Sequence, residues 1–308
     1  MDTIPPEILI CILSNLEKPL APYTSVCRAF QQVIETKTFK DITIISTLPQ
    51  IQRLDTVFED IRRRCLLRRL TFYVSLPNKL KRNRKRPLKY LRDRAFTLAI
   101  RRLFTCLEKW NYIPEWLQSP PSFTLRVQCT TPYVDYRAVR GEHKHVQFDG
   151  PQELPSLECI ETLLVESPHI FPSDMTIICN ALPRMEVLRW DLDNAPRRLK
   201  DLRVDLRNAM ATTLLETNFS RLEAMSIEWR DHDPLNHDWN PENYLDADGH
   251  DRLSMGVNRI LKLPNLRDLR LDGHFILSPE VFDLNDEDIP ESLEYLGIEI
   301  SKVTPAGS

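Results

Sequence analysis

The stretch "LPNLRDLRL", residues 263–271, places leucines at Leu266, Leu269 and Leu271, a Leu-x-x-Leu-x-Leu spacing that follows a proline. The same template, with apolar residues at positions 1, 4 and 6, returns at 160–166, 185–191, 222–228 and 293–299. Successive copies, counting that at 266–272, begin 25, 37, 44 and 27 residues apart. Recurrence at such intervals is typical of stacked repeat proteins, in which each unit buries its apolar face against the next.

Segments with helical apolar spacing separate the copies and also precede the first one. They cover 91–110, 174–182, 197–216 and 251–263. Strand-like segments at 67–74 and 123–129 extend the pattern toward the N-terminus, so we expect the repeats to begin near residue 45. Helix and strand in alternation predict an α/β protein with parallel strands joined by right-handed crossovers.

Composition indicates an ordinary soluble protein, with 42% hydrophobic and 28% charged residues and a net charge of −3. The longest apolar run, "ILICIL" at 8–13, is shorter than the ~18 residues of a membrane-spanning helix. No basic segment follows Met1, so we expect no signal peptide. The seven cysteines contain no CxxC pair. They predict reduced thiols and a cytoplasmic and/or nuclear location.

Glycine is scarce, with seven in the chain, and the closest pair is Gly249 and Gly256. Dinucleotide loops, P-loops and nucleophile elbows all need more closely spaced glycines, because the backbone must approach a phosphate or adopt positive φ there. No HExxH motif is present. We therefore expect no cofactor and no catalytic residues.

The segment 231–251 is the best candidate for an enzyme. It combines His232, His237 and His250 with many acidic residues, which are side chains that metal ions use as ligands. Its spacing does not fit an EF-hand loop, and no nucleophile–base pair can be assigned. The alternatives are a metal-dependent hydrolase and an insertion that is disordered or contacts a partner.

The N-terminal stretch "IPPEILICILSNL", residues 4–16, places two prolines before a helical pattern, where proline is tolerated. A second helical pattern follows at 24–35, with Val26, Ala29, Phe30 and Val33 on one side, and 39–45 looks extended. So short a segment cannot hide all of its apolar residues, each worth ~1.5–3 kcal/mol when buried. These helices must dock on the rest of the chain or on a partner.

Residues 2–45 resemble an F-box. The resemblance covers the Ile-Pro-x-Glu-Ile-Leu opening at 4–9, the Val-Cys-Arg of 26–28 and the closing extended segment. Residues 46–308 are similar to the leucine-rich-repeat region of fungal F-box proteins, although the repeats lack the regular Asn or Cys position. The resemblance implies an all-helical F-box over 1–45 and an irregular leucine-rich-repeat solenoid with parallel strands over 46–308.

The resemblance also implies a function, the recruitment of a protein substrate to an SCF-type (Skp–cullin–F-box) ubiquitin ligase. The F-box would bind a Skp-type adaptor and through it a cullin–RING ligase, and the chain would act by proximity alone. Two other interpretations stay open: internal packing of these helices, and an adaptor-bound role outside ubiquitination. The adaptor-binding candidates that the resemblance implies are Ile4, Pro5, Ile8, Leu9, Ile12, Leu13, Leu16, Val26, Cys27 and Phe30.

Position 7 of the template is acidic in all five copies. Strand side chains alternate between faces, so positions 5 and 7 should project from a concave surface when 4 and 6 are buried. Carboxylates on parallel strands ~4.8 Å apart repel each other and favour a cationic partner. We expect this row to bind a basic segment of a substrate, unless the acids never converge. The row is Glu166, Asp191, Glu228, Asp272 and Glu299.

The basic charge is concentrated in residues 61–102, which hold sixteen Lys and Arg against one acid, Asp93. Its centre is "KLKRNRKR" at 79–86. This run fits a nuclear import signal, a nucleic-acid contact, a segment that folds over the acidic row, or a solvated loop. No aromatic residue interrupts it, so stacking on single strands is not indicated. We expect neither a membrane nor a nucleic acid as the main partner.

Overall fold

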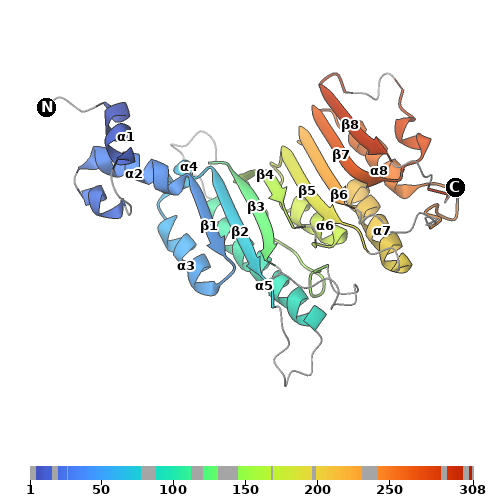
Figure 1. The fold of residues 1–308 in the computed structure, drawn as a ribbon, viewed down its shortest axis with the longest axis horizontal. Helices are drawn as coiled ribbons and strands as arrows, with labels where there is room; N and C mark the ends of the chain where they lie inside the picture. Colours follow the sequence, from blue (N-terminus) through green and yellow to red (C-terminus); the bar gives the residue numbers. More distant parts are fainter. Residues whose placement is uncertain are drawn as a thin grey trace.

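The computed structural model describes residues 5–15, 20–25, 27–77, 88–111, 121–130, 145–167, 169–195, 199–230, 242–285, 290–300 and 305–306. Eight strands form one parallel sheet whose spatial order is the order of the sequence (Figure 1). They are β1 (Asp41–Ile45), β2 (Arg69–Ser75), β3 (Phe123–Thr130), β4 (Ile160–Val165), β5 (Val187–Asp193), β6 (Ala224–Arg230), β7 (Asp268–Phe275) and β8 (Tyr295–Ile300).

Helices connect most of these strands. The described ones are α1 (Pro6–Ser14), η1 (Ala21–Ser25), α2 (Arg28–Phe39), α3 (Leu48–Val57), α4 (Ile61–Leu66), α5 (Leu88–Glu108), η2 (Lys109–Asn111), α6 (Pro172–Asn180), α7 (Lys200–Glu216), α8 (Arg252–Leu261) and η4 (Pro279–Phe282). None of the helices in this described part is long and apolar enough to cross a membrane.

The repeat template describes the inner face of the sheet. Positions 4 and 6 of β5, Leu188 and Trp190, are buried, and Arg189 between them is exposed. The strand register places equivalent positions side by side, so apolar rows run across the sheet. One row is Leu70, Leu125, Leu163, Leu188, Met225 and Leu269. Buried residues of α3 and α5–α8 join these rows in a single core cluster. Those helices therefore cover the inner face.

The fifth copy departs from the template. Leu296 in β8 occupies position 4 yet is 43% exposed, because β8 is an edge strand. Its neighbour β7 is irregular: the pairing shifts register between Leu271 and Phe275. Gly273 lies in this irregularity with φ +105°. The template therefore predicts the strand correctly but overestimates its burial.

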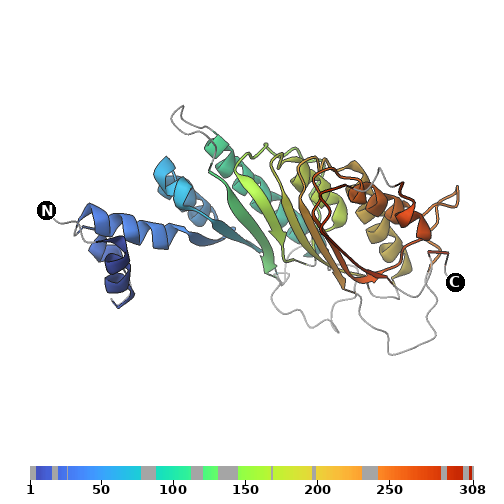
Figure 2. The same ribbon diagram turned by 90° about the horizontal axis from the view of Figure 1, so that it is seen from above.

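The N-terminal helices project beyond β1 at the end of the sheet (Figures 1 and 2). The extended segment expected at 39–45 forms β1 from Asp41 on, and it pairs with β2 from Asp41↔Arg69 to Ile45↔Tyr73. Its last residues therefore belong to the sheet, although the sequence groups them with the N-terminal helices. The basic run 79–86 lies outside the described residues.

Candidate functional site

Helix α1 divides its apolar residues between two faces. Pro5 is extended and accepts the N–H groups of Ile8 and Leu9, so proline begins the helix without losing a bond. Leu9 and Leu13 are 3% and 2% exposed, whereas Ile8 and Ile12 are 51% and 40% exposed. Leu9 and Leu13 therefore stabilise the helix pair, and Ile8 and Ile12 are exposed on its surface.

Helix α2 packs differently from the expectation. Cys27 is extended at its N-cap and exposed, and Phe30 is half-buried. Ala29, expected on the same apolar side as Phe30, is exposed, and Ile34 is the buried residue of α2. Ile34 follows Phe30 by four residues, so it belongs to the same apolar pattern of the sequence. Three candidates, Ile4, Leu16 and Val26, lie outside the described residues.

Cys11 is a surface residue of α1 that is not among the contacts expected from the sequence. It is exposed and follows Ile8 by three residues, so it shares a helical face with Ile8 and Ile12. Asn15, which ends the helix, is exposed on the same face. We call Ile8, Cys11, Ile12 and Asn15 the outer face of α1.

Contacts at the end of α2 hold the helix pair against the sheet. The Arg63 guanidinium of α4 lies 3.1 Å from the Glu35 carboxylate and 5.2 Å from the centre of the Phe39 ring. Phe39 also meets Phe58 edge to face at 5.6 Å. The helix pair is therefore attached through side chains of α2, while the outer face of α1 stays free of these contacts.

The five position-7 acids lie on neighbouring strands, as the repeat predicts. Asp191 pairs in register with Glu228, and Glu228 with Asp272. Glu166 directly follows Val165, which pairs with Trp190. Glu299 is close enough to β7 to accept the Gly273 N–H at 2.9 Å. The carboxylates therefore form one row across β4–β8, on the sheet face that the described helices do not cover.

Arginines of the same face neutralise part of this row. Arg126 in β3 binds the Glu166 carboxylate through Nε at 2.7 Å, and Gln128 Nε2 donates to the same oxygen at 2.6 Å. Arg230 Nε donates to Glu228 at 2.7 Å, which lowers the pKa of Glu228. The acidic row expected from the sequence is therefore a mixed surface, and the chain itself satisfies two of its acids.

Asp191 lies between Glu166 and Glu228 in the row and is buried. Burial raises its pKa, the neighbouring Glu228 raises it further, and Arg230, 3.6 Å away, opposes the shift. Its Oδ1 atom is buried with no hydrogen-bond partner in the described part of the chain. Asp272, by contrast, is exposed in β7. The least neutralised part of the row is therefore at β7 and β8.

The segment 231–251 provides no metal centre within the described residues. Glu242 pairs with Arg203 at 4.0 Å, and His250 Nδ1 lies 3.5 Å from Glu280. Asp251 caps α8 by accepting the N–H groups of Leu253 and Ser254. In the ranges that the structure describes, no group of three or more His, Cys, Asp or Glu is placed to hold a metal ion. His232 and His237 lie outside those ranges.

Asp251 also belongs to a buried ion pair between helices. Arg207 of α7 donates from Nη2 to both Asp251 carboxylate oxygens at 2.8 Å and to the Ile276 carbonyl at 2.6 Å. The Tyr244 ring lies against the guanidinium at 4.6 Å. All of these partners are internal, so the network fixes α7, α8 and the segment around Tyr244 in place.

Comparison of the chain with protein-family models, with curated proteins and with solved structures finds no match. The two surfaces with distinctive geometry in the described part of the chain are the outer face of α1 and the open face of the sheet.

Proposed function

We propose that this chain is a substrate-recognition adaptor of an SCF-type ubiquitin ligase, built as an F-box followed by an irregular leucine-rich-repeat solenoid. One observation supports it above the others: α1 buries Leu9 and Leu13 and leaves Ile8 and Ile12 exposed on a helix pair that projects from the sheet (Figure 1). Exposed neighbouring apolar side chains are costly in water and are typical of a surface that binds a partner.

The partner at this surface is a Skp-type adaptor that connects the chain to a cullin–RING ligase. Ile8 and Ile12 insert into an apolar groove of the adaptor, and Pro5, Cys27 and Phe30 lie at the rim. Leu9 and Leu13, buried inside the pair, hold the outer face in shape. Because the chain supplies proximity, a folded sheet and an intact helix pair are both required for ubiquitin transfer.

The substrate binds on the open face of the sheet through a basic segment. Arg126 and Arg230 already bind Glu166 and Glu228, so the exposed Asp272 and the Glu299 beside it supply the main attraction. Asp191, which lies beyond Glu228 and is buried, contributes less. Exposed charge pairs of this kind are screened by salt. A basic peptide should therefore bind at low salt and weaken as salt rises.

The test is ubiquitin transfer in a reconstituted ligase containing the adaptor, the cullin–RING module and this chain. Candidate substrates captured on the wild-type chain should be modified, and the Ile8→Asp/Ile12→Asp variant should leave them unmodified. Capture of substrate by a chain that binds the adaptor but supports no transfer would favour a role outside ubiquitination. Activity of the isolated chain on a small ester, lost with chelator, would instead favour the metal-dependent hydrolase.

A further inference from the structure

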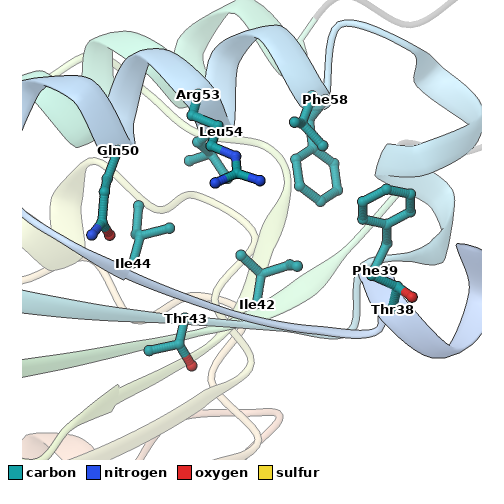
Figure 3. A pocket seen from close by; sticks show the side chains of 10 residues that line it. Thr38, Phe39, Ile42, Thr43, Ile44, Gln50, Arg53, Leu54 and Phe58 are labelled. Carbon is teal, nitrogen blue, oxygen red and sulfur yellow. The ribbon is translucent and has the colours of Figure 1, made fainter. Parts of the chain in front are cut away.

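A cavity of about 370 Å³ lies between the edge strand β1 and helix α3 (Figure 3). Ile42 and Ile44 form its floor, and α3 contributes Leu54 and Phe58 above them. The Thr43 side chain points to the opposite face of the strand (Figure 3). The remaining lining residues are Thr38, Phe39, Gln50, Arg53 and Val57.

The cavity exists because β1 ends the sheet. Every inner strand has apolar neighbours on both sides, whereas Ile42 and Ile44 have the neighbours Leu70 and Phe72 on one side only. The Phe39–Phe58 ring pair closes one end of the cavity. Gln50 stands at the other end, and its Oε1 atom accepts the Ile45 N–H at 2.6 Å. The walls are therefore apolar and are held in place by α2, α3 and β1.

Arg53 and Gln50 contribute hydrogen-bond donors to the cavity. Arg53 is exposed, and its side chain extends from α3 toward β1 beside Leu54 (Figure 3). The Gln50 amide retains its N–H groups because its oxygen already accepts the Ile45 N–H. Two acids on the adjoining helices are engaged with other cations: Asp55 of α3 binds Lys109 at 2.5 Å, and Glu35 of α2 binds Arg63 at 3.1 Å. Within the described part of the chain, no carboxylate lies within ion-pair distance of Arg53.

We propose that this cavity binds a small amphipathic carboxylate. The apolar tail packs on Ile42, Ile44 and Leu54. The carboxylate accepts two parallel hydrogen bonds from the Arg53 guanidinium, which is the geometry in which guanidinium groups bind carboxylates most strongly. The volume falls in the lower part of the ~300–1,000 Å³ range of small-molecule sites. Residues of both α2 and β1 line the cavity. An occupant that contacts both elements therefore stabilises the connection between the helix pair and the sheet.

The probe is decanoate, compared with decanol and decylamine, which keep the tail and change the head group. Isoleucine methyl groups of the full chain are labelled, and the Ile42 and Ile44 signals are assigned through Ile42→Val and Ile44→Val variants. Decanoate should shift both signals saturably, while decylamine should not. Arg53→Met removes the charge and keeps apolar length, and it should weaken decanoate binding at least about ten-fold. Arg94→Met, which alters an exposed arginine of α5, should leave it unchanged.

Absence of saturable shifts at Ile42 and Ile44 overturns the proposal. Equal affinity for decanoate and decylamine, or unchanged affinity in Arg53→Met, overturns the carboxylate assignment. None of these results depends on the adaptor, because the measurement uses the chain alone. The inference is therefore independent of the proposed ubiquitin-ligase function.

Discussion

Replacement of Asp251 should destabilise the chain strongly, because the buried Arg207 of α7 would lose its charge partner. Arg207 and Asp251 are 5% and 1% exposed, and the Arg207 guanidinium has the Asp251 carboxylate as its charge partner. Asp251→Ser keeps an N-cap side chain for α8 but leaves the guanidinium buried and unpaired. Breaking a buried pair in this way costs about 3–5 kcal/mol, so we expect a loss in the free energy of unfolding of about that size.

The matched experiment is a double-mutant cycle followed by urea unfolding. Arg207→Leu should also destabilise, because it leaves the Asp251 carboxylate buried without its cation. The double variant Arg207→Leu/Asp251→Ser removes both charges and keeps the cap, so it should cost no more than the worse single variant. If the two single losses simply add, or if Asp251→Ser costs less than about 1 kcal/mol, the interpretation of this pair is wrong.

Three further predictions concern backbone strain, pH and thiol reactivity. Gly273→Ala should cost at least about 2 kcal/mol, because φ is +105° and the added Cβ would clash with the Trp229 carbonyl oxygen of β6. Gly150→Ala, at φ +81° with open space around it, should cost about 1 kcal/mol, and equal losses for the two variants in urea unfolding would contradict this prediction. Burial raises the pKa of Asp174 from 3.8 to about 7. Its folded form thus holds a proton that the unfolded chain releases, so stability should fall by up to a few kcal/mol from pH 4 to pH 7. Asp174→Asn should reduce this dependence of the free energy of unfolding on pH. An equal change with pH in the wild type and the variant would refute the prediction. Iodoacetamide should modify the exposed Cys11 and Cys27 in the native chain, as read by peptide mass spectrometry. The bound adaptor should protect Cys11. Labelling of Cys11 that is the same with and without the adaptor would contradict the assignment of the outer face of α1 as the contact. The buried thiols should stay unmodified, because burial raises their pKa to about 11 in Cys106 and to about 12 in Cys159 and Cys179.

The repeat strands could be predicted because their signal is local. Leu188 and Trp190 alternate with polar residues in a period of two, and Leu206, Met210 and Leu214 of α7 recur at helical spacing. Each strand is found within a few residues of its expected place. Helix α3 is not among the elements expected from the sequence. Its signals are nevertheless present: Pro49 lies in its first turn, and Ile51, Leu54 and the C-cap residue Phe58 are buried together.

The details of both surfaces depend on contacts that the sequence does not display. Arg126 neutralises Glu166 across 40 residues of sequence, so the mixed charge of the open face is a property of strand pairing. On α1 the apolar stripe includes both Leu9 and Ile8, and only packing against α2 determines which of the two is buried. Charges at Leu9 and Leu13 would therefore disrupt the helix pair itself, and they cannot serve as a clean probe of adaptor binding.

The most direct test of the central proposal is co-purification of the chain with a Skp-type adaptor. The variant is Ile8→Asp/Ile12→Asp. The matched control is Leu48→Asp, which places a charge at an apolar residue of α3 that is 47% exposed and lies away from the outer face of α1. The wild type and the control should retain the adaptor, whereas the double variant should lose it while its circular dichroism stays native, because charges in a buried apolar interface are costly. Equal retention by the double variant, or no binding by the wild type, would contradict the assignment of the outer face of α1 as the adaptor-binding surface.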